Sequence, residues 1–223
     1  MVYLIGILAF GLSWLVRARF KSVMGQLSRT ATTSGMTGKE IAEAMLEAYN
    51  IHDVQVVATG GMLTDHYNPA KRTVNLSEAV YHQRSITAAA VAAHECGHAV
   101  QHATSYSFLR MRSSLVPVVS LASRFSGPVL LGGIVLLNSF PQLLLIGIIM
   151  LGAATLFSLI TLPVEFDASR RALNWLEESR ITVGEEQTLA KKGLKWAAMT
   201  YVVAALGSLA TLLYYLSIFQ QRR

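Results

Sequence analysis

Long apolar runs without acidic residues alternate along the chain with segments of mixed polarity. Four such runs predict helices that cross a membrane, since a span needs about 17–25 mostly apolar residues. The first run is short and is followed by basic residues, so we interpret it as a retained anchor rather than as a cleaved signal peptide. The predicted spans are residues 2–16, 115–137, 143–162 and 196–219.

Residues 24–112 have the polarity of a compact, water-facing domain. The segment 37–50 begins with a capping box and then repeats apolar residues at helical spacing. A short strand is expected at 53–57, and a β-hairpin where "MLTDHY" and "RTVNLS" flank the turn sequence "NPAK". From Ser85 an alanine-rich stretch predicts a buried helix. The expected fold is therefore an α+β membrane protein, mainly α, with about four transmembrane helices and a short β-hairpin or sheet.

The composition supports a membrane protein with one water-facing part. Only 14% of the residues are charged and 52% are hydrophobic, whereas about 25% of a soluble protein is charged. The net charge of +6 comes from basic residues that flank the apolar runs, where they suit anionic lipid headgroups. No nucleic-acid-binding motif accompanies them. We therefore expect a lipid bilayer, and no nucleic acid, as a partner.

The same basic residues predict the orientation of the chain. They cluster after the first span, before the second, after the third and before the fourth, and these places share one side of the membrane if the spans alternate. The positive-inside rule makes that side cytoplasmic, although Arg222 and Arg223 fall on the other side. We expect a multi-pass protein whose water-facing domain lies in the cytoplasm.

The stretch "VAAHECGHAVQHA", residues 91–103, places ionisable side chains within the predicted buried helix. His94 and His98 are one helical turn apart, so both imidazoles can reach one ion from the same face. Glu95 completes the H-E-x-x-H pattern, in which two histidines hold zinc and the glutamate polarises the zinc-bound water. The alternative is a helix whose histidines are satisfied by neighbouring side chains. Because burying these groups without a partner is costly, a metal ion is the simplest partner.

Two further residues of this helix are unsuited to the same ion. His102 lies two turns from His94, about 12 Å along the axis. The sequence also lacks the glycine that brings the third histidine of metzincins back to the metal. Cys96 lies on the opposite face of the helix, where we interpret it as a small packing residue. The third ligand is therefore expected from another segment.

Glu165 in "TLPVEFDASRRAL" is the candidate for this third ligand. Two predicted spans separate it from His98, so both residues lie on the same side of the membrane. In this interpretation Pro163 ends the third span, and a new helix within residues 163–195 completes the zinc site. The alternative is a juxtamembrane acid that pairs with the arginines that follow it.

The motifs "HECGHAVQ", "LTDHYNP…VNLSEAVYH" and "EFDASRRAL" together resemble those of the YugP-type neutral zinc metallopeptidases of bacterial membranes. The resemblance extends from Thr37 to about Ala172 and includes the pattern of spans. The layout is similar to that of HtpX-type and CAAX-prenyl proteases, which are gluzincins with two His and one Glu on zinc. It implies a gluzincin-like zinc peptidase domain with Glu95 as general base. The implied Zn2+ ligands are His94, His98 and Glu165.

The chain departs from the gluzincin pattern at one position. An Asp four residues after the ligand Glu often braces a ligand histidine there, whereas this chain has Ser169, and the nearby acid is Asp167. Gluzincins also commonly lay the peptide along an edge strand and steady the tetrahedral intermediate with a Tyr or His. His66, beside the expected hairpin turn, is our candidate for this role. The alternatives are Tyr67, His82, Arg170 and Arg171.

The function expected from these features is that of a membrane-embedded zinc endopeptidase of the bacterial plasma (inner) membrane. Its active site faces the cytoplasm, and its substrates are membrane-associated or misfolded proteins. A non-proteolytic zinc-binding scaffold or regulator is the alternative, but a structural site has no need of a general base such as Glu95. A metal transporter ranks last, because Arg124 is the only charged residue within the predicted spans. The sequence does not define the oligomeric state.

Overall fold

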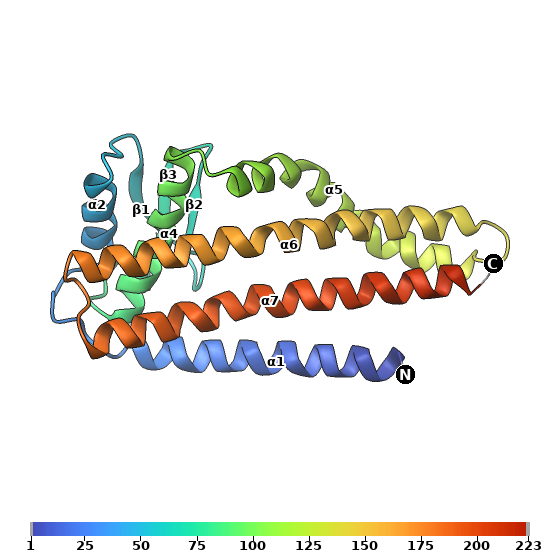
Figure 1. Ribbon diagram of the computed structural model, residues 1–223, viewed down its shortest axis with the longest axis horizontal. Helices are drawn as coiled ribbons and strands as arrows, with labels where there is room; N and C mark the ends of the chain where they lie inside the picture. The colour runs from blue at the N-terminus through green and yellow to red at the C-terminus, as the bar shows by residue number, and fades with distance from the viewer. Residues whose placement is uncertain (1, 222–223) are drawn as a thin grey trace.

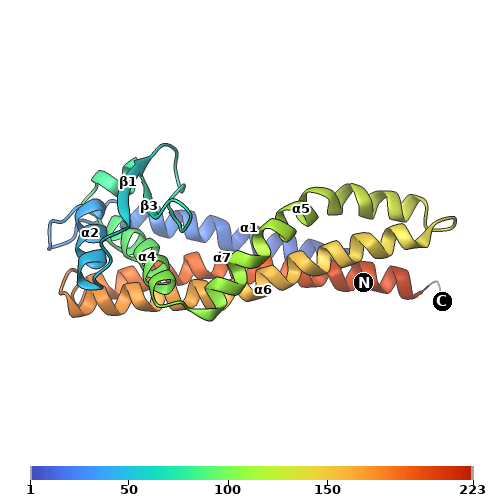
Figure 2. The ribbon, with the colours of Figure 1, turned by 90° about the horizontal axis from the view of Figure 1, so that it is seen from above.

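The computed structural model describes residues 2–221, and all of their side chains except those of residues 2–6, 8 and 9. Helices α1 (Val2–Leu27), α6 (Pro141–Glu178) and α7 (Glu185–Gln220) run along the length of the molecule (Figure 1). Helix α5 (Ser107–Val135) forms a hairpin with α6 at one end. The small sheet and the shorter helices gather at the other end, as Figure 2 shows. The molecule therefore has an apolar helical part and a compact α/β part.

Three helices among the described residues are long and apolar enough to cross a membrane, namely α5, α6 and α7. Helices α6 and α7 contain the predicted spans 143–162 and 196–219 completely. Helix α5 contains the predicted span 115–137 except for its last two residues. Each is longer than its predicted span, because polar turns at one end continue into the α/β part. The predicted anchor 2–16 lies in α1, which is not among the three, so the fourth span stays a prediction.

The third predicted span does not end at Pro163. Helix α6 is continuous over 38 residues, and Pro163 lies in its interior. The prediction of a separate helix within residues 163–195 is therefore wrong. The first part of this segment belongs to α6, and the chain reverses at 179–184 before α7 begins. An interior proline costs about 3 kcal/mol in an isolated helix, but α6 is packed against α4, α5 and α7. This packing favours the continuous helix over a break.

The sheet has three strands in the order β1–β3–β2, with bounds Gln55–Thr59, Thr73–Ser77 and His66–Asn68. Strands β2 and β3 form the predicted antiparallel hairpin, with Tyr67 opposite Val74. Strand β1 begins two residues later than expected and pairs with β3 in parallel. Strand β2 is thus an edge of the sheet, and it contacts α4.

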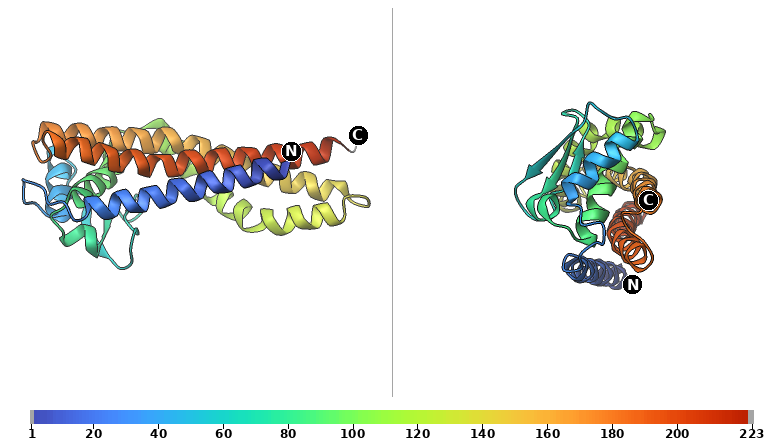
Figure 3. Two further views of the ribbon diagram at one scale, coloured as in Figure 1. Left: turned by 90° about the horizontal axis from the view of Figure 1, so that it is seen from below. Right: turned by 90° about the vertical axis from the view of Figure 1, so that its left-hand side faces the viewer.

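Short helices cover this sheet. Helix α2 (Gly38–Ala48) has the predicted capping box, in which Glu40 Oε2 accepts from the backbone N–H of Thr37 at 2.7 Å. Helix α3 (Glu78–His82) was not expected, and α4 (Ile86–Ala103) is the predicted alanine-rich helix. The end-on view in Figure 3 shows the sheet to one side of the long helices, and α4 contacts β2 and β3 as well as α6 and α7. The hydrophobic core surrounds α4, whose alanines are buried except for Ala103 at its end.

Helices α4 and α6 approach closely at Gly97. A Cβ atom on Gly97 would lie 2.6 Å from the carbonyl oxygen of Ala168 and 3.1 Å from its Cα. Such contacts are with backbone, which cannot move aside like a flexible side chain. Gly97 therefore sets the spacing between the helix that carries His94 and His98 and the helix that carries Glu165.

We expect Gly97→Ala to lower the thermal midpoint in detergent and to weaken metal binding, because the added methyl group separates α4 from α6. Overpacking of this kind costs about 1–3 kcal/mol. Gly207→Ala in α7 is the matched control, since nothing lies within 4 Å of a Cβ there, and it should leave both quantities near the wild-type values. Differential scanning fluorimetry with and without zinc measures the two effects. Equal behaviour of the two variants would contradict the steric explanation.

Candidate metal centre

Two histidines of α4 and one glutamate of α6 come together between these helices. Glu165 Oε2 lies 3.3 Å from His94 Nε2 and 3.6 Å from His98 Nε2. The ligand atoms of the three residues all lie within 4.8 Å of one another. His98 and Glu165 are buried, and His94 is partly buried. The continuous helix α6 places Glu165 in its interior, not in the first turn of a new helix.

These separations fit a zinc ion. Zinc takes imidazole nitrogen and carboxylate oxygen at about 2.0–2.2 Å with tetrahedral geometry, which puts neighbouring ligand atoms about 3.3 Å apart. The distances from Glu165 Oε2 to the two imidazoles lie close to this value. Three protein ligands also leave the fourth position for water or substrate, as in catalytic zinc sites.

The Nδ1 atoms of His94 and His98, which are not the nitrogens nearest Glu165, each have a polar partner. Ser169 Oγ lies 3.1 Å from His94 Nδ1, and Gln101 Oε1 lies 3.1 Å from His98 Nδ1. Ser169 thus contacts a candidate ligand histidine from the position where gluzincins often have Asp. No local pattern predicts the contact by Gln101, which resembles an ordinary polar residue of a helix. Such partners orient the ring and select its tautomer.

Charge around Glu165 favours the ionised carboxylate. Burial raises the pKa of its carboxyl, but the hydrogen bonds and charges of His94 and His98 outweigh burial and hold the pKa well below its usual range. Burial by itself would lower the pKa of the His98 imidazole. The hydrogen bond and the charge of Glu165 outweigh burial, so the pKa of His98 is raised. Arg112 Nη1 of α5 lies 3.4 Å from Glu165 Oε1, which leaves Oε2 to face the histidines. Arg112 was not among the sequence candidates, because no local pattern links it to this site.

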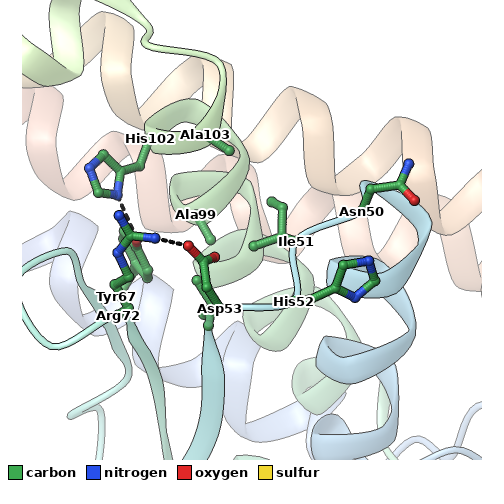
Figure 4. Close-up of a pocket in the computed structure, with 10 residues that line it drawn as sticks. Asn50, Ile51, His52, Asp53, Tyr67, Arg72, Ala99, His102 and Ala103 are labelled. Carbon is green, nitrogen blue, oxygen red and sulfur yellow. Dashed lines mark hydrogen bonds and ion pairs between the residues drawn. The ribbon is translucent and has the colours of Figure 1, made fainter.

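Glu95 faces the edge strand of the sheet. Its Oε2 accepts a hydrogen bond from the backbone N–H of Tyr67 in β2 at 3.0 Å, and its side chain is buried. The Tyr67 hydroxyl lies 2.7 Å from His102 Nδ1, further along α4 (Figure 4). His102 therefore has a partner of its own, and it is not in the group formed by His94, His98 and Glu165.

The other sequence candidates lie away from the three converging ligand atoms. His66 is exposed, and its Nδ1 lies 2.7 Å from the carbonyl oxygen of Thr64. Because neighbouring side chains of a strand point to opposite faces and Tyr67 reaches toward α4, His66 points to the other face of the sheet. No described contact joins His66 to the ligand residues, so its proposed role stays a prediction.

The structure also shows the surroundings of the two arginine candidates and of Cys96. Asp167 pairs with Arg170 and Arg171. Burial raises the pKa of Asp167, but the hydrogen bonds from Arg171 and Gln101 outweigh this and lower it. The arginines are thus engaged by Asp167, which removes the main reason to assign them to a reaction intermediate. The Cys96 thiol is fully buried, and burial raises its pKa, as expected for a packing residue.

Comparison with known proteins assigns the chain to a family. Residues 2–220 match the family described as "Putative neutral zinc metallopeptidase". The chain belongs to this family. The resemblance drawn from the sequence motifs is thereby confirmed. Zinc is the metal in the family's description, and the cluster of His94, His98 and Glu165 could bind a metal ion.

A curated relative of this family covers almost the whole chain. The "Putative membrane protease YugP" of Bacillus subtilis (strain 168) is 45% identical over 217 residues, which are 97% of this chain and 96% of the relative. No solved structure matches the chain. These names describe a zinc metallopeptidase and a membrane protease, and they do not specify a substrate or an orientation.

Proposed function

We propose that the protein is a membrane-embedded zinc endopeptidase with His94, His98 and Glu165 as metal ligands and Glu95 as general base. The observation that carries this proposal is the convergence of three ligand atoms beside a buried glutamate that faces an edge strand. A purely structural zinc site has four protein ligands and no base. Three ligands with an adjacent carboxylate favour catalysis over the alternative function as a scaffold or regulator.

The roles of the residues follow from their positions. His94, His98 and Glu165 would hold Zn2+, which when bound lowers the pKa of its water to near 7 and polarises the scissile carbonyl. Glu95 takes a proton from the attacking water and transfers it to the nitrogen of the leaving amine as the C–N bond breaks. The N–H of Tyr67 donates to Oε2 of Glu95, so Oε1 is the oxygen that is free to accept this proton.

The location of the ligands supports membrane-associated substrates. Glu165 lies three residues beyond the predicted span 143–162, which is about 4.5 Å of helix rise. Arg112 on α5 similarly precedes the span 115–137. A peptide segment that emerges from the bilayer could therefore reach the ligands without crossing the water-facing domain.

A cavity that could hold part of an extended substrate begins about one turn of α4 beyond Glu95. Glu95, Ala99 and His102 lie on one face of α4, because they are four and three residues apart. Ala99 and His102 line a cavity of about 540 Å³, which Tyr67 borders from β2 (Figure 4). Pockets of about 300–1,000 Å³ accommodate small ligands and side chains. We propose that substrate residues beyond the scissile bond occupy this cavity.

Proteolysis of casein by the purified protein in detergent tests the proposed function. Zinc-loaded protein should cleave casein at internal bonds, 1,10-phenanthroline should stop the cleavage, and added zinc should restore it. Cleavage that a chelator does not affect would contradict a zinc mechanism. Absence of cleavage by protein with a full complement of zinc would favour the scaffold alternative.

The orientation of the chain gives a separate prediction. We propose that the α/β part faces the cytoplasm of a bacterial cell and that the turn between α5 and α6 faces outward. Ala70 and Ser139 are both exposed and lie in these two regions. In a Cys96→Ala background, a membrane-impermeant maleimide should label Ser139→Cys in intact cells and Ala70→Cys only after permeabilisation. The reverse pattern would overturn the orientation.

A further inference from the structure

One buried side chain joins α4 to α6 directly beneath the three ligands. Gln101 is completely buried. Its Nε2 donates to the carbonyl oxygen of Val164 at 2.8 Å and to Asp167 Oδ2 at 2.9 Å. Its Oε1 lies 3.1 Å from His98 Nδ1. Both N–H groups of the amide and its oxygen thus have a named partner.

These partners allow only one orientation of the amide. A backbone carbonyl accepts hydrogen bonds and cannot donate them, so the NH2 group of Gln101 must face Val164. Asp167 is also an acceptor here, because Arg170 and Arg171 both pair with its carboxylate. The remaining oxygen of Gln101 then faces His98 and can only accept.

The orientation of the amide determines the tautomer of His98. An acceptor opposite Nδ1 requires that nitrogen to carry the hydrogen, which leaves Nε2 with its lone pair. Nε2 is the nitrogen that lies 3.6 Å from Glu165 Oε2, on the side of the ligand cluster. The opposite tautomer would present an N–H to the metal and could not bind it.

We propose that Gln101 is a positioning residue of the metal site, which holds His98 in the tautomer and ring orientation that bind zinc, with Asp167 and Val164 fixing the amide. The inference rests on the proposed function only through the assignment of His98 as a ligand. The competing explanation is that Gln101 merely joins two helices. Both explanations allow metal affinity to fall, because α4 and α6 carry the candidate ligands, but only the proposal predicts that the tautomer of His98 changes as well, which the ¹⁵N shifts of its imidazole report.

Gln101→Met tests the proposal, because methionine is unbranched and similar in length but neither donates nor accepts strongly. We expect the zinc affinity of the purified full chain, measured by competition with a chromogenic chelator, to fall about 10–100-fold, as for other outer-shell partners. Gln187→Met is the matched control. Gln187 also donates through Nε2 to a carbonyl of α6, that of Leu173 at 2.8 Å, and its Oε1 accepts from Thr182. It should lose some thermal stability with unchanged zinc affinity.

A second variant covers the case in which Gln101→Met does not fold. Asp167→Asn preserves the size of the side chain but removes the ionised acceptor of Gln101. The amide is then held by the carbonyl oxygen of Val164 alone, so zinc affinity should fall, although by less than in Gln101→Met. Wild-type zinc affinity in either folded variant would overturn the role of Gln101. Failure of the wild-type protein itself to bind zinc would instead refute the proposed ligand set, so the two failures are distinguishable.

Discussion

Glu95→Gln should abolish peptide hydrolysis while zinc stays bound. The amide keeps the size of the carboxylate, and its oxygen can still accept from the N–H of Tyr67, so the local structure should persist. It cannot accept the proton of the attacking water, and general acid–base catalysis contributes about 10²–10⁴-fold to rates. We therefore expect turnover of a fluorogenic peptide to fall by about this factor, with zinc content equal to that of the wild type.

Glu47→Gln provides the control for this substitution. Glu47 is an exposed residue of α2, and exchanging its charge should leave turnover unchanged. Near wild-type turnover in zinc-loaded Glu95→Gln would refute the role of Glu95. A simultaneous loss of zinc would show that the carboxylate supports the site structurally.

Glu165→Ala should remove zinc and activity together. His94 and His98 alone offer two ligands from one helix, and no other described acid belongs to their cluster. The variant also leaves Arg112 without the carboxylate that it pairs with, which adds a positive charge beside the metal position. Zinc affinity should fall by more than the 10–100-fold typical of losing an outer partner, as measured by metal analysis after dialysis against a weak chelator.

Two further variants make this test specific. Glu165→Asp should be intermediate, because the shorter side chain strains a Zn–O distance of about 2.0–2.2 Å. His102→Ala should leave zinc content unchanged, since His102 contacts Tyr67 and not the ligand cluster. Full zinc in Glu165→Ala, or lost zinc in His102→Ala, would show that the third ligand has been assigned wrongly.

Features encoded by local patterns could be predicted from the sequence. The capping box of α2, the β2–β3 hairpin and helix α4 each follow from residues close together in the chain, and all are present. The proximity of Glu165 to the histidines is expected from the predicted topology, because two predicted spans would return the chain to the same side of a membrane. The parallel pairing of β1 with β3 could not be predicted in this way, since it joins segments with no local signal of each other.

Other features depend on tertiary packing that the sequence does not display. Pro163 is a helix breaker by local rules, yet packing on several sides favours a continuous α6. Arg112 and Gln101 contact the ligand residues from ordinary helical positions, so only the folded structure reveals their partners. The role of His66 rests on residue type and on its place beside the hairpin turn, and its described contact is with the carbonyl oxygen of Thr64, so this role stays a prediction.

Mass spectrometry of casein fragments produced in H2¹⁸O tests the central claim most directly. A zinc endopeptidase adds the oxygen of water to the scissile carbonyl, so the purified zinc-loaded protein should generate new internal carboxyl termini that each carry one ¹⁸O from the cleavage step. Glu95→Gln, purified in the same way, should generate none of them. Identical fragments from both preparations would identify a contaminating protease, and the absence of new termini from zinc-loaded wild-type protein would contradict an endopeptidase function.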